Sequence, residues 1–417
     1  MALRHDPSVT TAARHTKAAA SRIDQARAGR LPQLQYSESW TRSNNPVFVF
    51  SSLLLQRQFT EKNLALGPLN RPDFLDNFQS QVTVEQTVYD WGAAEARIRA
   101  AEAAHGAAQQ QEEAARLSLT ARVIHAYSSA VLAEAGVAAA QAAVRSAEAD
   151  EERARAMRSA GLSTDSDVLS IQAHLAAMRE LEIRRRYEAR AALAALNEAL
   201  GQPLDTPLQL TTELRPAPIP AESPESYAAA AAKRRPDLAQ TRLALTGAGQ
   251  QLLAARSALR PQLFLRGGFE ANRQEFIRQG GANWLITASL RWNLFDGGAS
   301  RARVTEASAA QEAAQAQLRE MEHGVQLEVF RAWTEARSAN ERVAVVGAAV
   351  AQAEESLRII KNRYEHGLAT VTDLLRNEMA LLEARMRQLA AIDDQRLAAA
   401  HLELVAGTLS AQSEALQ

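Results

Sequence analysis

The residue types that most often do chemistry in proteins are spread along this 417-residue chain without a catalytic or metal-binding spacing. No two of the eight histidines lie three or four residues apart, the spacing that places two metal ligands on one face of a helix. They are His5, His15, His105, His125, His174, His323, His366 and His401. Gly297-Gly298 lacks the rest of a phosphate-binding loop, and no nucleophile elbow is present. The sequence therefore predicts no catalytic residue, no metal site and no cofactor, and it favours a protein that is not an enzyme.

The amino-acid composition excludes further classes of protein. The chain has 47 basic and 48 acidic residues, a balance that gives no electrostatic support for binding nucleic acid. It has no cysteine, which excludes disulfides, cysteine metal sites and a cysteine-linked lipid anchor within these residues. Aromatic residues make up only 5%, and small side chains suit helices that pack closely along their length.

The stretch from Asp90 to Gly201 occurs twice, and the second copy lies 206 residues later without a gap. The matched pairs are Asp90 and Asp296, Gly92 and Gly298, Arg97 and Arg303, Val123 and Val329, Ala126 and Ala332, Gly161 and Gly367, Asp167 and Asp373, and Gly201 and Gly407. Each copy is rich in alanine and free of proline up to a glycine 71 residues after its first aspartate. A helix of that length would be roughly 100 Å long. The repeat predicts two long rods.

Each rod is followed by a return helix. Gly161 and Gly367 are each followed by Ser, Thr and Asp residues, which is the order in which one helix ends and another begins. We expect long helices over 90–160 and 296–366. The return helices should then cover 164–201 and 370–407. Residues 203–226 contain six prolines and are predicted to be an extended linker between a first repeat, 1–202, and a second repeat, 227–417.

The remaining part of each repeat begins with a helix and continues as a pair of strands. Residues 1–31 have helical apolar spacing that ends at Pro32, and the second repeat has a comparable helix that ends at Pro261. Alternating apolar and polar residues then predict β-hairpins over 33–89 and 262–295, with strands of roughly 8–11 residues. Glu38 interrupts the apolar face of the first strand.

Period-two alternation fits a soluble sheet on a core and fits equally a transmembrane β-barrel strand. On the pattern alone the soluble sheet is favoured, but no amphipathic helix lies next to these strands in the sequence to cover them, which reverses the preference. No uninterrupted run of about 18 apolar residues is present, so no transmembrane helix is predicted. The first hairpin has 23 extra residues within 43–79. We interpret them as a long surface loop, which is either a cap or receptor site at the outer end or a tolerated insertion.

Each rod starts at a short motif, Tyr89-Asp90-Trp91-Gly92 or Phe295-Asp296-Gly297-Gly298. An aspartate at the start of a helix can cap free backbone N–H groups, and glycines allow a tight change from strand to helix. Asp90, Gly92, Asp296 and Gly298 are therefore predicted to form the strand-to-helix junctions.

Taken together, these features resemble the TolC-like outer-membrane efflux proteins over nearly the whole chain. The resemblance rests on the Leu-Pro-Gln-Leu opening, the two junction motifs, and the Gly-Leu-x-x-x-x-Asp-[Val/Leu]-Leu tips within a tandem repeat. It implies a mostly helical fold with a small β part. Three copies would form a homotrimer, in which each chain gives four strands to a twelve-stranded β-barrel and its helical hairpins to an α-barrel.

The resemblance also implies a place and partners. The β-barrel would contact outer-membrane lipid, and the α-barrel would project into the periplasm and meet a periplasmic adaptor and an inner-membrane transporter. The protein would conduct substrates passively to the outside as an exit duct. The first residues lack the apolar region of a signal peptide, so a leader would have been removed or trimmed.

In the family, the hairpin tips close the periplasmic entrance. By position, Tyr364 matches a tyrosine of an inter-helix link, Asp167 an acid on the facing tip, and Asp373 the first acid of an inward ring. The chain departs from the pattern at Ala369, where an arginine of the closing network is expected, and at Arg376, where a second acid is expected. The simpler alternative is that Asp167 and Asp373 only cap the return helices.

Two other functions remain open on these residues. The duct could belong to a type I protein secretion system, which the sequence does not separate from small-molecule efflux. In a different class, the chain could be a soluble coiled-coil scaffold whose strands form a small sheet. The sequence identifies neither the substrate nor the class of pump.

Overall fold

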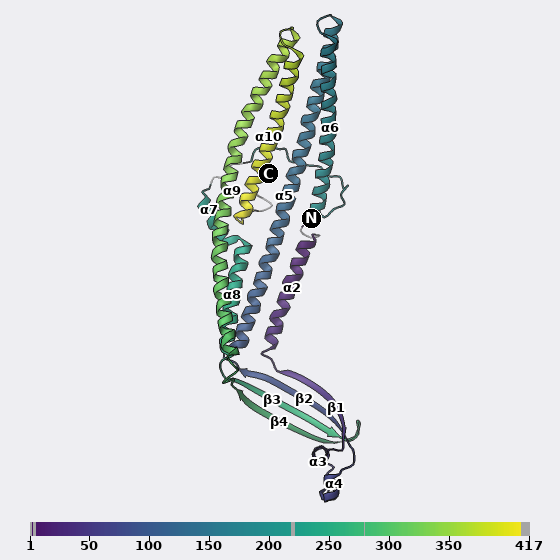
Figure 1. Ribbon diagram of the computed structural model, residues 1–417, viewed down its shortest axis with the longest axis vertical. Coiled ribbons are helices and arrows are strands. Elements are labelled where there is room, and N and C mark those ends of the chain that lie inside the picture. Colours follow the sequence, from purple (N-terminus) through teal and green to yellow (C-terminus); the bar gives the residue numbers. More distant parts are fainter. Residues whose placement is uncertain (1, 3–5, 218–221, 279, 410–417) are drawn as a thin grey trace. The chain divides into compact units, whose positions relative to one another are not determined.

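The computed structural model describes residues 2, 6–217, 222–278 and 280–409, as a mostly helical chain with one sheet (Figure 1). The helices before the linker are α2 (Pro7–Ala28), α3 (Pro46–Leu55), the 3₁₀ turn η1 (Glu61–Leu64), α4 (Leu66–Asn70), α5 (Ala93–Ser159) and α6 (Asp165–Leu200). Those after it are α7 (Pro224–Arg234), α8 (Pro236–Ser257), α9 (Ala299–Glu365) and α10 (Val371–Val405). The strands are β1 (Gln33–Ser43), β2 (Leu75–Tyr89), β3 (Gln262–Arg273) and β4 (Gly281–Arg291).

The chain divides into two compact units. The helical unit comprises residues 1–15, 108–241 and 318–417, and the sheet unit comprises residues 16–107 and 242–317. The long helices α5 and α9 each contribute to both units.

The two rods of the repeat have the same length. Helices α5 and α9 each contain 67 residues, and their alanine-rich, proline-free sequences allow them to continue over this length. Both begin three residues after the aspartate at which the sequence placed the start, because Asp90 and Asp296 lie in the turn before the helix. The fold class predicted from the sequence, mostly helical with a small sheet and an internal repeat, is confirmed.

The helices of the helical unit pack through heptad positions. On α9, Val325, Val329, Ala332, Ala336 and Ala339 are buried at alternating spacings of four and three residues. This spacing keeps one seam of a helix against its neighbours, as in a left-handed coiled coil. The seam packs against α7, α8 and α10 through Ala231, Leu238, Ala398 and Leu402. Most of these side chains are small, which lets the helix axes approach closely.

The start of the second repeat differs from the single helix that the sequence predicts. Helix α7 begins inside the predicted linker, because Ser223 accepts a hydrogen bond from the Ser226 N–H and Pro224 occupies the first helical turn. The helix stops before Pro236, since a residue that precedes proline is driven out of the helical conformation. Within the described part of the predicted linker, residues 203–217 contain no helix or strand.

One window of α5 qualifies the prediction that no transmembrane helix is present. An 18-residue segment of this helix reaches a mean hydropathy of 1.3, and 28% of that window is buried. The segment is part of a 67-residue helix, and a single helix of this kind is weak evidence for a membrane span. Polar residues interrupt its apolar sequence, so it contains no uninterrupted apolar run of the length that the sequence prediction requires. We assign no membrane span to it.

The four strands form one antiparallel sheet in the order β1-β2-β3-β4, so β2 and β3 join the two repeats. Strand β2 has 15 residues, longer than the sequence predicted. The register places apolar side chains on one face. They are Leu34, Tyr36, Trp40, Phe78, Val82, Val84, Leu263, Leu265, Phe269, Trp284, Ile286 and Leu290. The other face is largely polar. It includes Gln35, Ser37, Gln79, Gln81, Thr83, Arg266, Glu270, Asn272, Asn283 and Thr287.

The apolar face of the sheet is exposed. Trp284 and Leu290 are 74% and 68% accessible. Glu38, which interrupts this face, accepts hydrogen bonds from the Tyr36 hydroxyl at 2.8 Å and from Arg273 at 3.0 Å. The Ser80 hydroxyl also donates to it. Cross-strand partners therefore compensate this acidic group on a largely apolar surface.

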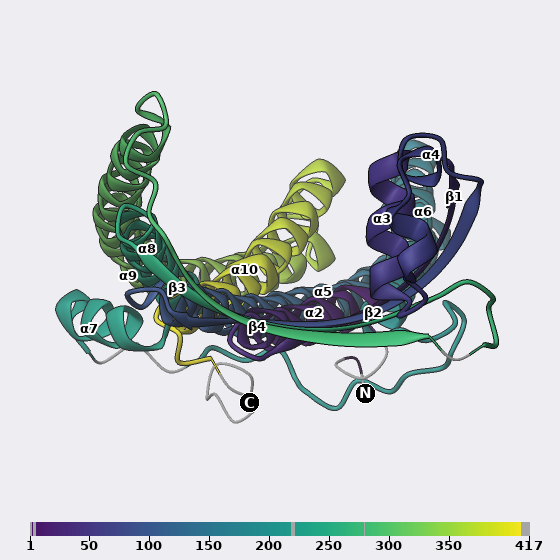
Figure 2. The same cartoon turned by 90° about the horizontal axis from the view of Figure 1, so that it is seen from below.

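The 43–79 insertion is more ordered than the loop that the sequence predicts. It contains α3, η1 and α4, and Asn45 caps α3 by accepting from the N–H groups of Val47 and Phe48. Figure 2 shows α3 and α4 on the inner side of the curve that the sheet describes.

Candidate functional site: hairpin tips and strand-to-helix junctions

The two hairpin tips are built in the same way. Gly161 and Gly367 adopt φ values of +77° and +70°, in the left-handed region that favours glycine. At the first tip, the Gly161 N–H donates to Arg158 O at 2.9 Å and the Leu162 N–H donates to Met157 O at 2.9 Å. This is the Schellman pattern, and the second tip repeats it at Gly367 and Leu368. Nothing lies within 4 Å of a Cβ placed on either glycine, so the backbone angle alone accounts for the residue type.

The acids of both tips belong to capping boxes. Thr164 and Thr370, not the aspartates, are the N-cap residues. The Asp373 N–H donates to Thr370 Oγ1 at 3.2 Å, and the Thr370 N–H donates back to Asp373 Oδ2 at 3.2 Å. Asp167 and Thr164 make the same reciprocal pair. The sequence-based alternative of simple capping by aspartate is thus corrected in detail: each aspartate lies at the third helical position.

These hydrogen bonds keep both aspartates ionised. The Thr164 backbone and hydroxyl lower the pKa of Asp167. The Thr370 hydroxyl and backbone lower the pKa of Asp373, and the positive charges of Arg376 and Arg363 lower it further. Arg376 is exposed on the first turns of α10. Each tip therefore presents a carboxylate at neutral pH, but at the second tip an arginine lies close enough to offset part of its charge.

Tyr364 joins the two tips. Its side chain is 5% exposed and packs in a core of Ala154, Val168, Ile171 and Leu374, which come from both hairpins. Ala369 borders the same core with its methyl group. Burial raises the pKa of Tyr364, and the charge of Asp167 adds to the effect. The contact of Tyr364 with the facing tip is therefore mostly apolar, and Ala369 extends it where an arginine would add a charge.

A buried group of charges lies further along the hairpins, and the sequence reasoning missed it. Asp150 on α5 is 0% exposed, and Lys361 Nζ on α9 lies 2.8 Å from its Oδ1 atom. On α10, Glu378 is buried, with His174 Nε2 of α6 at 3.0 Å and the Ser146 hydroxyl donating at 2.9 Å. We call Asp150, His174, Lys361 and Glu378 the inter-hairpin cluster. No local spacing could have found it, because each member comes from a different helix.

The two carboxyl groups of the inter-hairpin cluster differ in charge. Burial and the neighbouring Glu378 raise the pKa of Asp150 to about 6. Burial would also raise the pKa of Glu378, but hydrogen bonds from His174, Asp150 and Ser146 lower it below its ordinary value. Arg153 pairs with Asp150 and also contacts Glu365 at 3.2 Å. Asp150 therefore takes up a proton in mildly acidic conditions, whereas Glu378 stays ionised.

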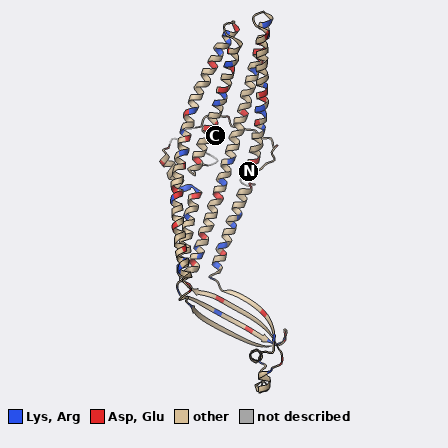
Figure 3. Cartoon of the chain, in the orientation of Figure 1, with Lys and Arg blue, Asp and Glu red and all other residues tan. Residues whose placement is uncertain are grey.

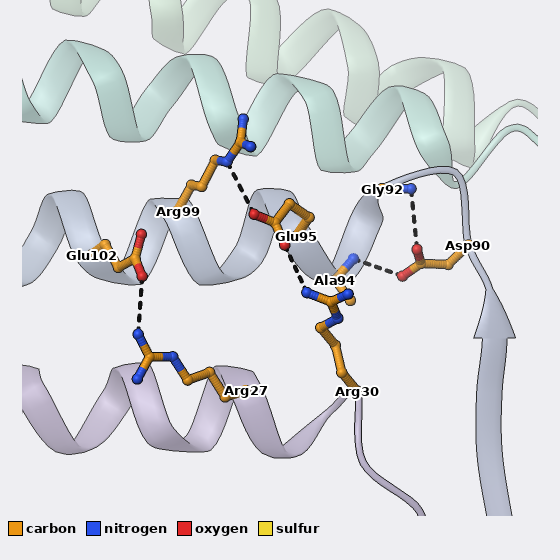
Figure 4. Close-up of polar contacts among 8 residues, drawn as sticks. All are labelled: Arg27, Arg30, Asp90, Gly92, Ala94, Glu95, Arg99 and Glu102. Atoms are coloured by element: carbon orange, nitrogen blue, oxygen red, sulfur yellow. Dashed lines mark hydrogen bonds and ion pairs between the residues drawn. The ribbon is translucent and has the colours of Figure 1, made fainter.

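At the first strand-to-helix junction, Asp90 caps α5 from the turn before the helix (Figure 4). Its carboxylate accepts from the Gly92 N–H at 3.1 Å and from the Ala94 N–H at 2.6 Å. Gly92 has a φ of +82°. Ion pairs then tie α2 and the turn that follows it to α5. Arg30 lies 2.8 Å from Glu95, and Arg27 lies 3.2 Å from Glu102 (Figure 4).

The second junction repeats the cap with a different turn. The Ser300 N–H donates to Asp296 at 2.9 Å, and hydrogen bonds from Ser300 lower the pKa of this aspartate. Gly297 and Gly298 have φ values of +67° and +91°. The first repeat has Trp91, at a φ of +56°, in place of Gly297.

Trp91 was not singled out from the sequence as a site residue. A non-glycine residue at positive φ is strained, and here three contacts hold it. The Trp91 indole donates to Pro261 O at 2.8 Å, the Ser257 hydroxyl donates to Trp91 O at 3.0 Å, and the Arg260 guanidinium lies 4.9 Å from the ring centre. Trp91 thus fastens the first junction to the start of β3.

Within the described residues, no group of three or more histidine or acidic side chains could hold a metal ion. Charged residues of both signs are distributed along the helices (Figure 3). The site therefore consists of caps, turns and helix contacts. Together with a sheet that has an exposed apolar face and long paired hairpins, it is typical of a membrane channel subunit.

The profile of outer membrane efflux proteins matches residues 1–202 and 228–408, and the chain belongs to this family. It is 29% identical over 423 residues to protein CyaE of Bordetella pertussis, covering 98% of this chain and 83% of that protein. It is 25% identical over 419 residues to the alkaline protease secretion protein AprF of Pseudomonas aeruginosa, covering 98% of this chain and 83% of the relative. The protein is therefore an outer-membrane exit duct for efflux or secretion.

Solved structures show the same fold. The outer membrane protein VceC from Vibrio cholerae superposes with a TM-score of 0.79 at 23% identity, over 97% of this chain and 94% of that one. The structure of CusC gives a TM-score of 0.84 at 19% identity, over 97% and 90% of the two chains. These likenesses confirm the predicted resemblance, and the scaffold alternative is not supported.

Proposed function

We propose that three copies of this chain form a continuous duct that crosses the outer membrane and projects into the periplasm. Residues 1–202 and 227–417 would each supply one helical hairpin and two strands to it. A periplasmic adaptor and an inner-membrane transporter would deliver substrates to the hairpin tips, and the duct would conduct them passively.

The observation that supports this proposal is the sheet with an exposed apolar face and two open edges. Within the described residues, β1 and β4 each pair on one side only. An open edge leaves backbone N–H and C=O groups unpaired, which is costly in contact with lipid. Closure with two further copies pairs both edges and directs the apolar face to lipid and the polar face to water.

The tips would then form the periplasmic entrance. Gly161, Asp167, Tyr364, Gly367, Asp373 and Arg376 are the residues we assign to it. With Ala369 apolar and Arg376 basic, the entrance would be held closed mainly by the core around Tyr364 and by the inter-hairpin cluster.

The proposal is tested by exporting the full chain to the outer membrane and extracting it with detergent. We expect trimers that dissociate on heating and single-channel currents in planar bilayers. A monodisperse monomer that is soluble without detergent would overturn the proposal.

A second candidate narrows the cargo to exported proteins. The names of two relatives favour it. AprF is an alkaline protease secretion protein, and PrtF of Dickeya chrysanthemi, 24% identical over 424 residues, is a proteases secretion protein. Complementation separates the alternatives. The chain would restore protease export in a strain that lacks its secretion duct, or it would restore drug resistance in a strain that lacks its efflux duct.

A further inference from the structure

Helix α3 is apolar on its exposed side as well as on its buried side. Its buried side holds Val49 and Ser52, and Gln56 follows directly on the same side. Its exposed side holds Val47 and Leu54, which are 76% and 49% accessible, with Phe50 between them. A helix on a protein surface normally turns its polar side outward. The exposed side of α3 therefore indicates a surface that is covered in the assembled protein.

Polar contacts fix α3 on the polar face of the sheet. The Gln56 side-chain amide donates to Asp76 O and to Asn77 Oδ1, both at 2.9 Å. The Asn77 amide in turn donates to Asn272 Oδ1 at 2.9 Å. Gln56 is 2% exposed and Asn272 is 0% exposed, so this chain of amides is removed from solvent. Because Asn77 and Asn272 belong to the polar face, α3 lies on the side that lines the proposed duct.

A close approach fixes the same end of the helix against β4. The carbonyl oxygen of Leu55 lies so near Gly281 that a Cβ atom on this glycine would be 1.8 Å away. Arg57 donates to Ala282 O at 3.3 Å. The segment thus begins after β1 and ends against the first residues of β4, on the inner side of the curved sheet (Figure 2). It is anchored across the width of the sheet and does not hang free from one turn.

The insertion covers only part of its own apolar surface. The ring of Phe50 meets that of Phe59 at 5.0 Å between centroids, and a cavity of about 190 Å³ separates α3 from Leu69 and Phe74. Val47 and Leu54 lie outside these contacts, because they remain exposed. None of the described residues of this chain covers these two side chains, which leaves a second chain as the partner of this surface.

The radius of the proposed duct indicates what contacts the exposed side of α3. Twelve strands about 4.8 Å apart and tilted by about 40° close a barrel with a backbone radius of roughly 12 Å. Three helices of about 10 Å diameter, placed side by side, fill a circle of about 11 Å radius. Three copies of α3 on the inner wall therefore cannot avoid one another.

We propose that the α3 helices of three protomers pack together across the outer mouth of the duct and form a hydrophobic constriction through Val47, Phe50 and Leu54. This inference rests on the trimer of the proposed function. The partner of the exposed surface is a second copy of the same chain.

The absence of cysteine allows a direct test. Val47→Cys and Leu54→Cys are each introduced into the full chain, and the membrane-embedded protein is oxidised. We expect one disulfide in each trimer, which links at most two of its three chains. Ile277→Cys is the matched control, since Ile277 is 95% exposed in the other outer turn. Copies of a rim residue would be roughly 20 Å apart. That exceeds the limit of about 7 Å between Cα atoms for a disulfide.

Conductance is the second measurement. The double variant Val47→Ser/Leu54→Ser should raise the single-channel conductance at least twofold, whereas Ile277→Ser should leave it unchanged. Trimers that conduct but show neither the cross-link nor the conductance change would overturn the α3 inference and leave the proposed function standing. Cross-links without a change in conductance, or cross-links that no longer form when the trimers are diluted in detergent before oxidation, would overturn it as well. Failure to form trimers or currents at all would instead contradict the proposed function.

Discussion

Lys361 Nζ lies 2.8 Å from the Oδ1 atom of Asp150, so a lysine of the second hairpin reaches a fully buried carboxyl group of the first. A buried charge is tolerated only when it is paired or neutralised. The carboxylate of Asp150 can pair with Lys361, or it can be neutralised by taking up a proton. The contact between the hairpins of one chain therefore depends on protonation.

Asp150→Asn should remove this dependence. The pKa of Asp150 is raised to about 6, so the folded state binds a proton that the unfolded state has already released. Stability from this group is therefore present in mildly acidic solution and is lost as pH rises through about 6. Relative to the variant, the wild type should lose on the order of 1 kcal/mol between pH 5 and pH 7.5.

The measurement is hydrogen exchange of amides in α5 around Asp150 at several pH values. Several charged groups face this carboxyl group from the four helices: Arg153, His174, Lys361, Glu365 and Glu378. His174→Gln is the control, because it keeps Asp150 and removes the imidazole that contacts Glu378. If amide exchange in the wild type and in Asp150→Asn depends on pH in the same way, the group that takes up the proton is not Asp150.

Asp373→Ala separates capping from a role in conduction. Loss of the return hydrogen bond of the capping box should destabilise α10 by roughly 0.3–1.5 kcal/mol, because Thr370 still caps the helix. If the carboxylate also faces the entrance of the duct, the variant should in addition lower the preference for cations in planar bilayers.

Asp167→Ala is a matched control, since it removes an equivalent capping box from α6. Equal thermal destabilisation of the two variants with unaltered currents would reduce Asp373 to a cap.

Gly367→Ala and Gly324→Ala should change the stability of the folded protein in opposite directions. Gly367 has a φ of +70°, where a Cβ is strained, so alanine should cost about 1 kcal/mol. Gly324 lies inside α9 with open space around a Cβ, so alanine there should stabilise the helix by about 0.5–1 kcal/mol. Chemical denaturation of the extracted protein measures both changes in the free energy of unfolding, the expected loss for Gly367→Ala and the expected gain for Gly324→Ala. Stabilisation by Gly367→Ala would contradict the described turn.

Ile286→Lys and Thr287→Lys test the two faces of the sheet. Ile286 lies on the apolar face and Thr287, its neighbour, on the polar face. A lysine that faces the middle of the bilayer costs roughly 2–4 kcal/mol, whereas one that faces water in the duct costs little. The yield of heat-dissociable trimers should fall for Ile286→Lys alone. A similar loss for both variants would mean that the apolar face is not the lipid face.

The sequence predicts much of this fold because the repeat is long and regular. The matching Asp-to-Gly distances predict two rods of equal length, which the structure gives as 67 residues each. The alternation around Trp284 predicts a strand and which of its side chains share the apolar face. The separation of α7 from α8 is local too, but the sequence reasoning did not use Pro236 to divide them.

The parts that the sequence could not predict depend on contacts between distant segments. Asp150 and Glu378 are ordinary acids in charge-rich helices until four helices bring them together. The position of α3 on the polar face follows from Gln56, Asn77 and Gly281, which no local pattern relates. Trp91 at a positive φ is held by Ser257 and Pro261, more than 160 residues away.

The open edges of β1 and β4 have a consequence for biogenesis. Within the described residues, a single chain has no neighbour for either edge, so in the proposed trimer insertion and association would be one event. The rate of maturation should then rise steeply with the local concentration of newly exported chains. A chain with a damaged edge strand would be dominant-negative, because it would leave its two intact partners with a barrel that cannot close.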